Sequence, residues 1–251
     1  NGDQWKSIYS VSLLISALEY SKATKGTAQY DQSLYEKSMK LYNWIENNLR
    51  RDKVITYENG LQDGRSYTVN TIDYLYWTDF NVNRSGRTEK NGPDGGIRPK
   101  DITDNGSVSS LFGNMAMAAI NVTLYEMTGE KNYLTKAVQT AKSLANVYNR
   151  EGAFINDRDH NTNATFTYYY VTKVMTLNEI TSSEREMFGT TAYNIANYCR
   201  SSNGYYYPLW RKSSANNKKD PPTSMMINAT TATMVTAAAL AEKLGLIRYN
   251  G

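Results

Sequence analysis

The feature that most constrains this chain is a repeated pattern of two apolar, helix-forming stretches joined by a short break. Residues 124–137, LYEMTGEKNYLTKA, show it clearly, and residues 18–41 are a looser version. Apolar residues recur at the three- and four-residue spacing of an amphipathic helix, and a Gly follows the first helix. So short a break makes the two helices antiparallel neighbours. The pattern therefore predicts a helix hairpin that the chain uses more than once.

The same reasoning predicts seven helices. They are expected at about residues 5–24, 30–49, 107–128, 131–148, 164–180, 182–200 and 226–245. Connections after the first, third and fifth helices are short, and those after the second, fourth and sixth are long, so strict alternation places every long connection at one end. Stacked hairpins bury a core that one hairpin cannot bury alone. We therefore predict an all-α fold, as an α/α solenoid or a closed α/α toroid.

Helix composition separates an inner set from an outer set. Helices 107–128 and 226–245 are rich in small residues, which suit close approach in an inner ring. Helices 30–49 and 131–148 carry more charge and are amphipathic, as outer helices should be. The long connections then precede inner helices and bring aromatic rings and carboxylates to their positive N-terminal ends. Residues 71–80, TIDYLYWTDF, are expected to hold a short helix or strand within one such connection.

Composition excludes several classes of function. The net charge is +4 and most of the basic residues are scattered, whereas nucleic-acid binding needs a clustered basic face. No apolar run is long enough to span a membrane. Cys199 and His160 are single residues of their kind, so a zinc site is not expected, and the acidic loops lack the spacing of a calcium-binding EF-hand. We predict no metal and no cofactor.

The 21 Tyr residues suit a wet groove that binds polyhydroxylated ligands.

One segment resembles glycoside hydrolase family 76, the endo-α-1,6-mannanase-like proteins. Residues 112–115, FGNM, open the third predicted helix, and residues 124–137 follow the family pattern Leu-Tyr-x-x-Thr-Gly-Asp-x-x-Tyr-Leu-x-x-Ala. Upstream, residues 44–64 are similar to the family's outer helix and its Asp-Gly loop. The resemblance covers roughly residues 1–180. Leu-Tyr-x-x-Thr-Gly is shared by several α/α-toroid families, so it is a hairpin signature first.

The resemblance implies an (α/α)6-type toroid, in which residues 1–251 form a single domain that is the C-terminal part of a longer toroid. It also implies an exported glycosidase, periplasmic, cell-surface or secreted, that attacks α-1,6-linked mannan in a cleft at the inner-helix N-termini. We expect a monomer with a polysaccharide or oligosaccharide partner. The family carries a consecutive Asp-Asp pair, and this sequence has none. Two alternatives therefore stay open: a non-catalytic protein that captures surface glycans, and a helical scaffold that binds protein.

Candidate site residues come from the long connections and from the starts of inner helices. Two of them are implied by the resemblance: Asp63 matches the family's Asp-Gly loop, and Asn114 stands where the family has a Gln. Glycoside hydrolysis generally uses two carboxyl groups, and Asp79, beside an aromatic residue in YWTDF, is the one catalytic candidate, with a turn or N-cap role as the alternative. Sugar rings stack on aromatic faces, although core packing is the alternative for each ring. The predicted substrate-binding residues are Asp63, Trp77, Phe112, Asn114, Tyr168, Tyr169, Tyr207 and Trp210.

Overall fold

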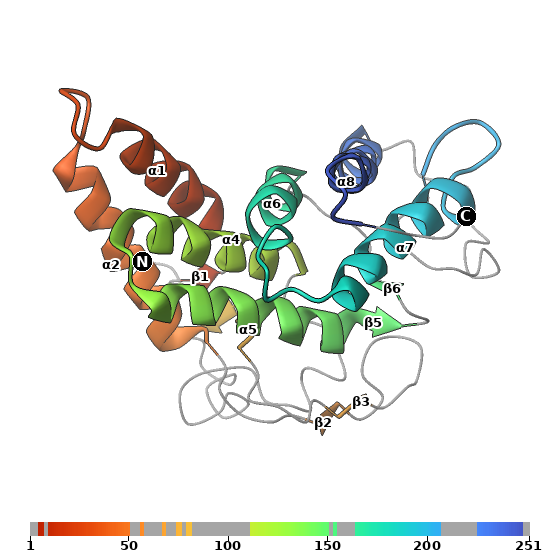
Figure 1. The fold of residues 1–251 in the computed structure, drawn as a ribbon, viewed down its shortest axis with the longest axis horizontal. Helices are drawn as coiled ribbons and strands as arrows, with labels where there is room; N and C mark the ends of the chain where they lie inside the picture. Colours follow the sequence, from red (N-terminus) through yellow and green to blue (C-terminus); the bar gives the residue numbers. More distant parts are fainter. Residues whose placement is uncertain are drawn as a thin grey trace. The chain divides into compact units, whose positions relative to one another are not determined.

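The structure, a computed structural model, forms two compact units, Asn1–Ser143 and Leu144–Gly251. It describes residues 5–7, 10–50, 56–57, 67–68, 74–76, 79–81, 111–150, 153–154, 164–206 and 225–247. Its helices are α1 (Val11–Thr24), α2 (Gln32–Asn48), α4 (Leu111–Thr128), α5 (Lys131–Tyr148), α6 (Ala164–Tyr169), the π-helix η2 (Tyr170–Val174), α7 (Ser182–Tyr198) and α8 (Met225–Lys243) (Figure 1). The all-α prediction is confirmed.

Three short two-stranded pairs accompany the helices within the described residues. They are β1 (Trp5–Ser7) with β4 (Asp79–Asn81), β2 (Thr56–Tyr57) with β3 (Tyr67–Thr68), and β5 (Asn149–Arg150) with β6 (Ala153–Phe154). Each pair is antiparallel. The stretch predicted to hold a short helix or strand therefore ends in strand β4.

The first unit is built around α4. Every residue from 113 to 124 is buried, as expected of an inner helix. α1 packs against both α2 and α4, and it buries one face formed by Val11, Leu14, Ile15, Leu18 and Ser21. Hairpins α1–α2 and α4–α5 are visible side by side in Figure 1. The predicted hairpins, α1 with α2 and α4 with α5, are confirmed.

Glycine ends the first helix of each hairpin, as the sequence indicates. Gly26 has a φ of 83° and Gly129 a φ of 76°, in the left-handed region that residues with a Cβ atom rarely adopt. The Gly129 N–H donates to the carbonyl oxygen of Tyr125 at 2.8 Å, which closes the last turn of α4. These turns reverse the chain within a few residues, so the connection between the two helices of each hairpin is short.

The predicted start of the first helix is wrong. Residues 5–7 form strand β1, whose partner is β4, with Trp5 opposite Asn81 and Ser7 opposite Asp79. Helix α1 begins only at Val11. The apolar spacing in this stretch fits a helix, but pairing with a segment more than 70 residues away supplies the backbone hydrogen bonds instead. A local pattern could not reveal this partner.

In the second unit α8 is the common packing partner, because both α6 and α7 contact it. Helix α7 begins with a capping box, in which the Thr181 hydroxyl accepts from the Glu184 N–H and the Glu184 carboxylate accepts from the Thr181 N–H. The predicted N-cap, Ser182–Ser183, is therefore wrong by one residue. Two reciprocal bonds at Thr181 fix the start of the helix.

The fifth predicted helix is two elements rather than one. α6 ends at Tyr169 and continues as the π-helix η2, which ends at Val174 with the Met175 N–H donating to the Tyr170 carbonyl oxygen at 3.1 Å. Successive turns, not a helix, then lead to Ile180. A π-turn adds one residue to the repeat, so the apolar residues of this stretch keep their burial although the helix ends early.

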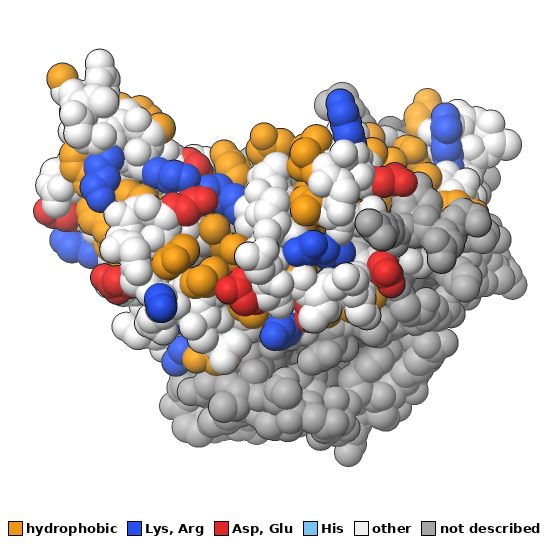
Figure 2. All heavy atoms as spheres, in the orientation of Figure 1, with side chains coloured by type: hydrophobic (Ala, Val, Ile, Leu, Met, Phe, Trp, Pro, Cys, Tyr) orange, Lys and Arg blue, Asp and Glu red, His pale blue; other side chains and the backbone are white. Residues whose placement is uncertain are grey.

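Charges of both signs are interspersed on the face shown in Figure 2, over the described parts of the chain. One pair on the surface of the first unit is Lys22 of α1 with Glu126 of α4. Of the helices that the structure describes, none is long and apolar enough to cross a membrane.

Candidate functional site

The backbone of Tyr76 is hydrogen-bonded to a side chain at the N-terminal end of α4. Tyr76 forms an isolated antiparallel bridge with Arg50, two residues beyond the end of α2. The side chain of Asn114, the fourth residue of α4, accepts from the Tyr76 N–H at 2.8 Å and donates to the Tyr76 carbonyl oxygen at 3.2 Å. Both residues are fully buried. We call this arrangement of Arg50, Tyr76 and Asn114 the first anchor.

The backbone of Tyr74, two residues earlier, is hydrogen-bonded to side chains of α5. Its N–H donates to the Ser143 hydroxyl at 3.3 Å, and its carbonyl oxygen accepts from the Thr140 hydroxyl at 2.9 Å. Buried backbone groups outside helices and strands need such partners. The segment Tyr74–Tyr76 is therefore fixed to two helices, α4 and α5, just before residue 77.

A buried carboxylate completes the first anchor. Glu46 of α2 accepts from the Tyr76 hydroxyl at 2.5 Å, and its other oxygen lies 2.6 Å from the Lys136 ammonium and 4.0 Å from the Arg50 guanidinium. A carboxylate this buried is stable only when it is paired and hydrogen-bonded. Burial, and then the Glu46 charge, raise the pKa of Tyr76 well above its usual value. The phenol therefore stays a donor to Glu46.

Tyr42 extends this network toward α4. Its hydroxyl donates to the Asn121 side chain at 2.7 Å and accepts from the Lys136 ammonium at 3.3 Å. The Asn121 amide nitrogen donates to the Met117 carbonyl oxygen at 2.9 Å. Burial, followed by the charge of Glu46, raises the pKa of Tyr42. The polar groups at the centre of the first unit thus satisfy one another across α2, α4 and α5.

A polar hollow of about 390 Å³ opens onto this network. Its lining residues are Tyr42, Asn43, Glu46, Asn47, Arg50, Tyr74, Asn132, Tyr133 and Lys136. The Arg50 guanidinium lies 5.3 Å from the centre of the Tyr74 ring, and the Lys136 ammonium lies 5.5 Å from that of Tyr42. The hollow is therefore bounded by cations held over aromatic faces.

None of the residues that line this hollow was among the predicted site residues. Most of them belong to α2 and α5, which were predicted as amphipathic outer helices and not as part of a site. A signal was nevertheless present, because Glu46 follows Ile45 on the apolar stripe of α2 and precedes Arg50 by four residues. A carboxylate beside a buried stripe requires a partner, and the structure supplies Lys136.

The second unit contains a matching arrangement. Tyr206 forms an isolated bridge with Arg200, which again lies two residues beyond the end of an outer helix, α7. The Tyr206 N–H donates to the side-chain oxygen of Asn228 at 2.7 Å, and Asn228 is the fourth residue of α8. We call these three residues the second anchor. The bridge, the acceptor and the helix position all repeat those of the first anchor.

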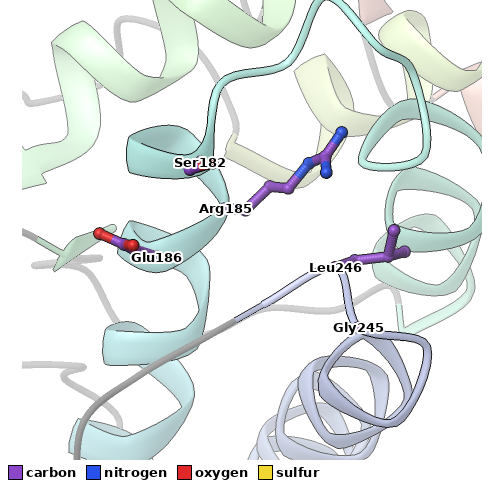
Figure 3. A pocket seen from close by; sticks show the side chains of 5 residues that line it. All are labelled: Ser182, Arg185, Glu186, Gly245 and Leu246. Atoms are coloured by element: carbon purple, nitrogen blue, oxygen red, sulfur yellow. The ribbon is translucent and has the colours of Figure 1, made fainter.

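A different hollow, of about 340 Å³, lies within the second unit between the start of α7 and the turn after α8. Its lining residues are Ser182, Arg185, Glu186, Gly245 and Leu246 (Figure 3). The Arg185 guanidinium donates to the Leu177 carbonyl oxygen at 2.8 Å, so it holds the preceding turn. No aromatic ring is among the described residues that line this hollow, and neither is any predicted site residue, so these residues offer no platform for a sugar.

Three predicted substrate-binding residues have described side chains. Asn114 is buried and its side chain is hydrogen-bonded to the backbone of Tyr76, so its role in the described structure is to hold that segment. Tyr168 is 51% exposed on α6, Tyr169 is half-buried, and their ring centres lie 5.7 Å apart, edge to face. Tyr168 is therefore open to solvent, and its ring contacts that of its sequence neighbour Tyr169.

The remaining predicted residues are described in part or not at all. The backbone of Asp79 lies in β4, and that of Phe112 lies in α4. Asp63, Trp77, Tyr207 and Trp210 lie outside the described residues. In sequence, Trp77 directly follows the anchored Tyr76, and Tyr207 directly follows the anchored Tyr206.

Among the described residues, no group of three His, Cys, Asp or Glu side chains could hold a metal ion. Cys199, at the C-terminal end of α7, is fully buried. It therefore behaves as a core residue, as expected of a small hydrophobic side chain.

Solved structures share this fold. A family 76 α-1,6-mannanase from Salegentibacter sp. matches with a TM-score of 0.60 at 17% identity, over 94% of this chain and 60% of that one. A family 76 α-mannanase from Bacteroides thetaiotaomicron matches with a TM-score of 0.57 at 16% identity, over 98% of this chain and 55% of that one. The fold is that of the family 76 glycoside hydrolases. The resemblance found in the sequence is confirmed at the level of the fold.

Sequence similarity to known proteins is much weaker than this likeness in fold. No family model matches the chain, and neither does any curated protein. The chain spans about 55–60% of the length of the solved family 76 proteins named above. One of the similar structures is an inactive Salegentibacter variant, with two consecutive aspartates replaced by asparagine, in complex with α-1,6-mannotriose. These comparisons therefore show that the chain has the helix hairpins of an (α/α)6-type toroid, and they do not show its activity.

Proposed function

We propose that this chain acts on α-mannan, as part of a glycosidase that attacks α-1,6-mannosidic linkages. The observation that carries the proposal is the fold likeness over 94% of the chain to an α-1,6-mannanase. An inactive variant of that enzyme binds α-1,6-mannotriose and another binds α-1,6-mannotetrose. A linear, polyhydroxylated ligand also agrees with the Tyr-rich composition of this sequence.

The proposed sugar-binding residues are the aromatic and polar residues of the long connections and inner-helix starts. They are Asp63, Trp77, Phe112, Tyr168, Tyr169, Tyr207 and Trp210. Support comes from the two anchors, because each fixes the backbone immediately before an aromatic residue, Trp77 in the first and Tyr207 in the second. Asn114 joins this set as a support for Tyr76 and not through contact with the sugar.

Asp79 is the proposed catalytic carboxylate, and it lies three residues beyond Tyr76 in strand β4. Hydrolysis generally requires a second carboxyl group, and no two aspartates are consecutive in this sequence. That fact favours a second candidate function, a glycan-binding protein of the same fold that does not hydrolyse its ligand. A monomeric, exported protein is proposed with either function.

Two measurements on the intact protein that contains these 251 residues separate the two functions. Calorimetry with α-1,6-mannotetraose tests binding, and chromatography of linear α-1,6-mannan after incubation tests hydrolysis. Binding with release of shorter oligosaccharides supports the glycosidase. Binding without release supports glycan capture, and a parallel incubation with α-1,4-linked glucan controls for specificity. If neither binding nor release occurs, the mannan proposal is wrong.

A further inference from the structure

The two anchors share a register that chance contacts would not repeat. In each, an Arg two residues past an outer helix bridges a Tyr, and the fourth residue of the next inner helix is an Asn that accepts the Tyr N–H. The donor–acceptor distances are 2.8 Å in the first anchor and 2.7 Å in the second. An Asn at the start of a helix is commonly a cap for its own backbone, yet here its oxygen serves a different segment.

We propose that Asn114 and Asn228 are positioning residues for the sugar-binding aromatic residues that follow the anchors. The proposal rests on the mannan function proposed above. Each Asn fixes the amide of one tyrosine, and the next residue in the chain is aromatic, Trp77 after Tyr76 and Tyr207 after Tyr206. Consecutive Cα atoms are only about 3.8 Å apart, so fixing one residue restricts the place from which the next side chain can extend.

In the first unit the restriction acts from two sides. Tyr76 is held by Asn114, and Asp79 is held in β4 by its pairing with Ser7 of β1. Trp77 is one residue from the first fixed point and two residues from the second. A stacking platform needs its ring in one place before the sugar arrives, because ordering it on binding lowers the affinity. Under this proposal, the two fixed points that flank Trp77 in sequence, Tyr76 and Asp79, supply that order.

The second anchor offers the cleaner test. Asn114 is fully buried and makes two hydrogen bonds to Tyr76, so its loss would disturb the core. Asn228 is half-buried, and its oxygen accepts the Tyr206 N–H. Asn228→Ala removes the acceptor, whereas Asn228→Asp keeps an oxygen at the same position. A positioning role predicts that Ala weakens sugar binding and that Asp restores it.

The experiment measures the dissociation constant for α-1,6-mannotetraose by calorimetry, with thermal melting as the folding control. The variants are Asn228→Ala, Asn228→Asp, Tyr207→Ala and the double variant Asn228→Ala with Tyr207→Ala. We expect Asn228→Ala to weaken binding about tenfold and Asn228→Asp to stay within about threefold of the wild type. We expect the double variant to bind as Tyr207→Ala does, because Asn228 acts through Tyr207.

Two results overturn the positioning role while leaving the mannan function intact. One is a folded Asn228→Ala chain that binds as tightly as the wild type. The other is a double variant whose loss is the product of the two single losses, since independent effects multiply. A wild-type chain without affinity for mannotetraose instead overturns the mannan function, and the proposed role of the two asparagines in sugar binding with it.

Discussion

The first and second anchors have the same register but very different surroundings. In the first, Tyr76 and Asn114 are fully buried, make two hydrogen bonds to one another, and are joined to Glu46 and Lys136. In the second, Tyr206 is half-buried and its N–H donates to a half-buried Asn228. The same hydrogen bond between a Tyr N–H and an Asn side chain can therefore form in a buried core or in a half-buried position. Its geometry depends on helix register, and its energy depends on burial.

This difference predicts that replacing a polar residue of the first anchor or its network lowers the free energy of unfolding more than replacing one of the second anchor. Removing one member of a buried, hydrogen-bonded pair leaves the other without a partner, at far greater cost than at the surface. The expected losses therefore decrease from the buried ion pair, through the anchors and the buried phenol, to the glycine turns.

The largest loss is expected for Lys136→Met, which leaves the buried Glu46 carboxylate without its nearest cation. We expect the free energy of unfolding to fall by about 3 kcal/mol. Urea denaturation followed by circular dichroism measures it. Lys22→Met is the matched control, because its pair with Glu126 is about one-third exposed and should contribute less than about 1 kcal/mol. Equal losses in the two variants would contradict the role given to Glu46.

The anchors themselves should differ when each asparagine is truncated. We expect Asn114→Ala to lower the free energy of unfolding by about 2–3 kcal/mol, since two buried partners on Tyr76 lose their bonds. Asn228→Ala should lower it by about 1 kcal/mol, because Tyr206 and Asn228 are only half-buried. The same urea denaturation measures both. A cost for Asn228→Ala that equals that of Asn114→Ala would mean that burial does not distinguish the anchors.

Alkaline pH should weaken the first unit through Tyr76. Burial raises the pKa of this phenol above its usual 10.0 in the folded chain, so its contribution is fully present below about pH 10. Above about pH 10 the unfolded chain releases the proton and the folded chain keeps it, so stability falls by up to about 1.4 kcal/mol per pH unit for this group. Urea denaturation between about pH 9 and pH 11 measures the slope.

Tyr76→Phe is the test of that assignment, since it removes the titrating group but keeps the ring. Its stability should fall less steeply than that of the wild type above about pH 10. A residual slope is expected, because burial also raises the pKa of Tyr42. Identical slopes in the two chains would show that Tyr76 does not contribute.

The smallest effects, and equal ones, are expected at the helix-ending glycines. Gly129 in the first unit has a φ of 76° and Gly245 in the second a φ of 71°, and a Cβ atom at either would meet no neighbour within 4 Å. Each substitution by Ala should therefore cost only the backbone strain, about 1 kcal/mol. Thermal melting of the two variants checks this. A clear difference between them would mean that the turns, like the anchors, depend on their unit.

Much of the fold could be predicted because helix signals are local. The bounds of α5 were predicted to the residue, and the C-terminal ends of α2 and α4 within one residue, since periodic apolar positions, and for α4 a following Gly, are read within one stretch. The start of α1 could not, because β1 pairs with residues 79–81. The π-turn of η2 also escaped, since the apolar spacing continues through it.

The site was less predictable because its contacts join distant parts of the sequence. Glu46 and Tyr76 are 30 residues apart, and Tyr76 and Asn114 are 38 apart. Asn114 was singled out because it stands where the similar family has a Gln, but its partner Tyr76 was not predicted. A partial signal for the two anchors was present in the sequence, because an Arg stands two residues beyond the end of α2 and of α7, at Arg50 and Arg200. Arg150 holds the same place after α5 but pairs with Ala153 of β6, so the signal alone does not identify an anchor.

The attachment by one amide oxygen has a consequence for how such a chain can change. From tyrosine to asparagine the chain runs 38 residues in the first anchor and 22 in the second, yet both hydrogen bonds form. Closing a longer stretch of chain costs little, about 0.6 kcal/mol for each doubling of its length. Insertions and deletions between the two residues can therefore accumulate while the helices stay in place, so ligand preference can diverge without a new scaffold.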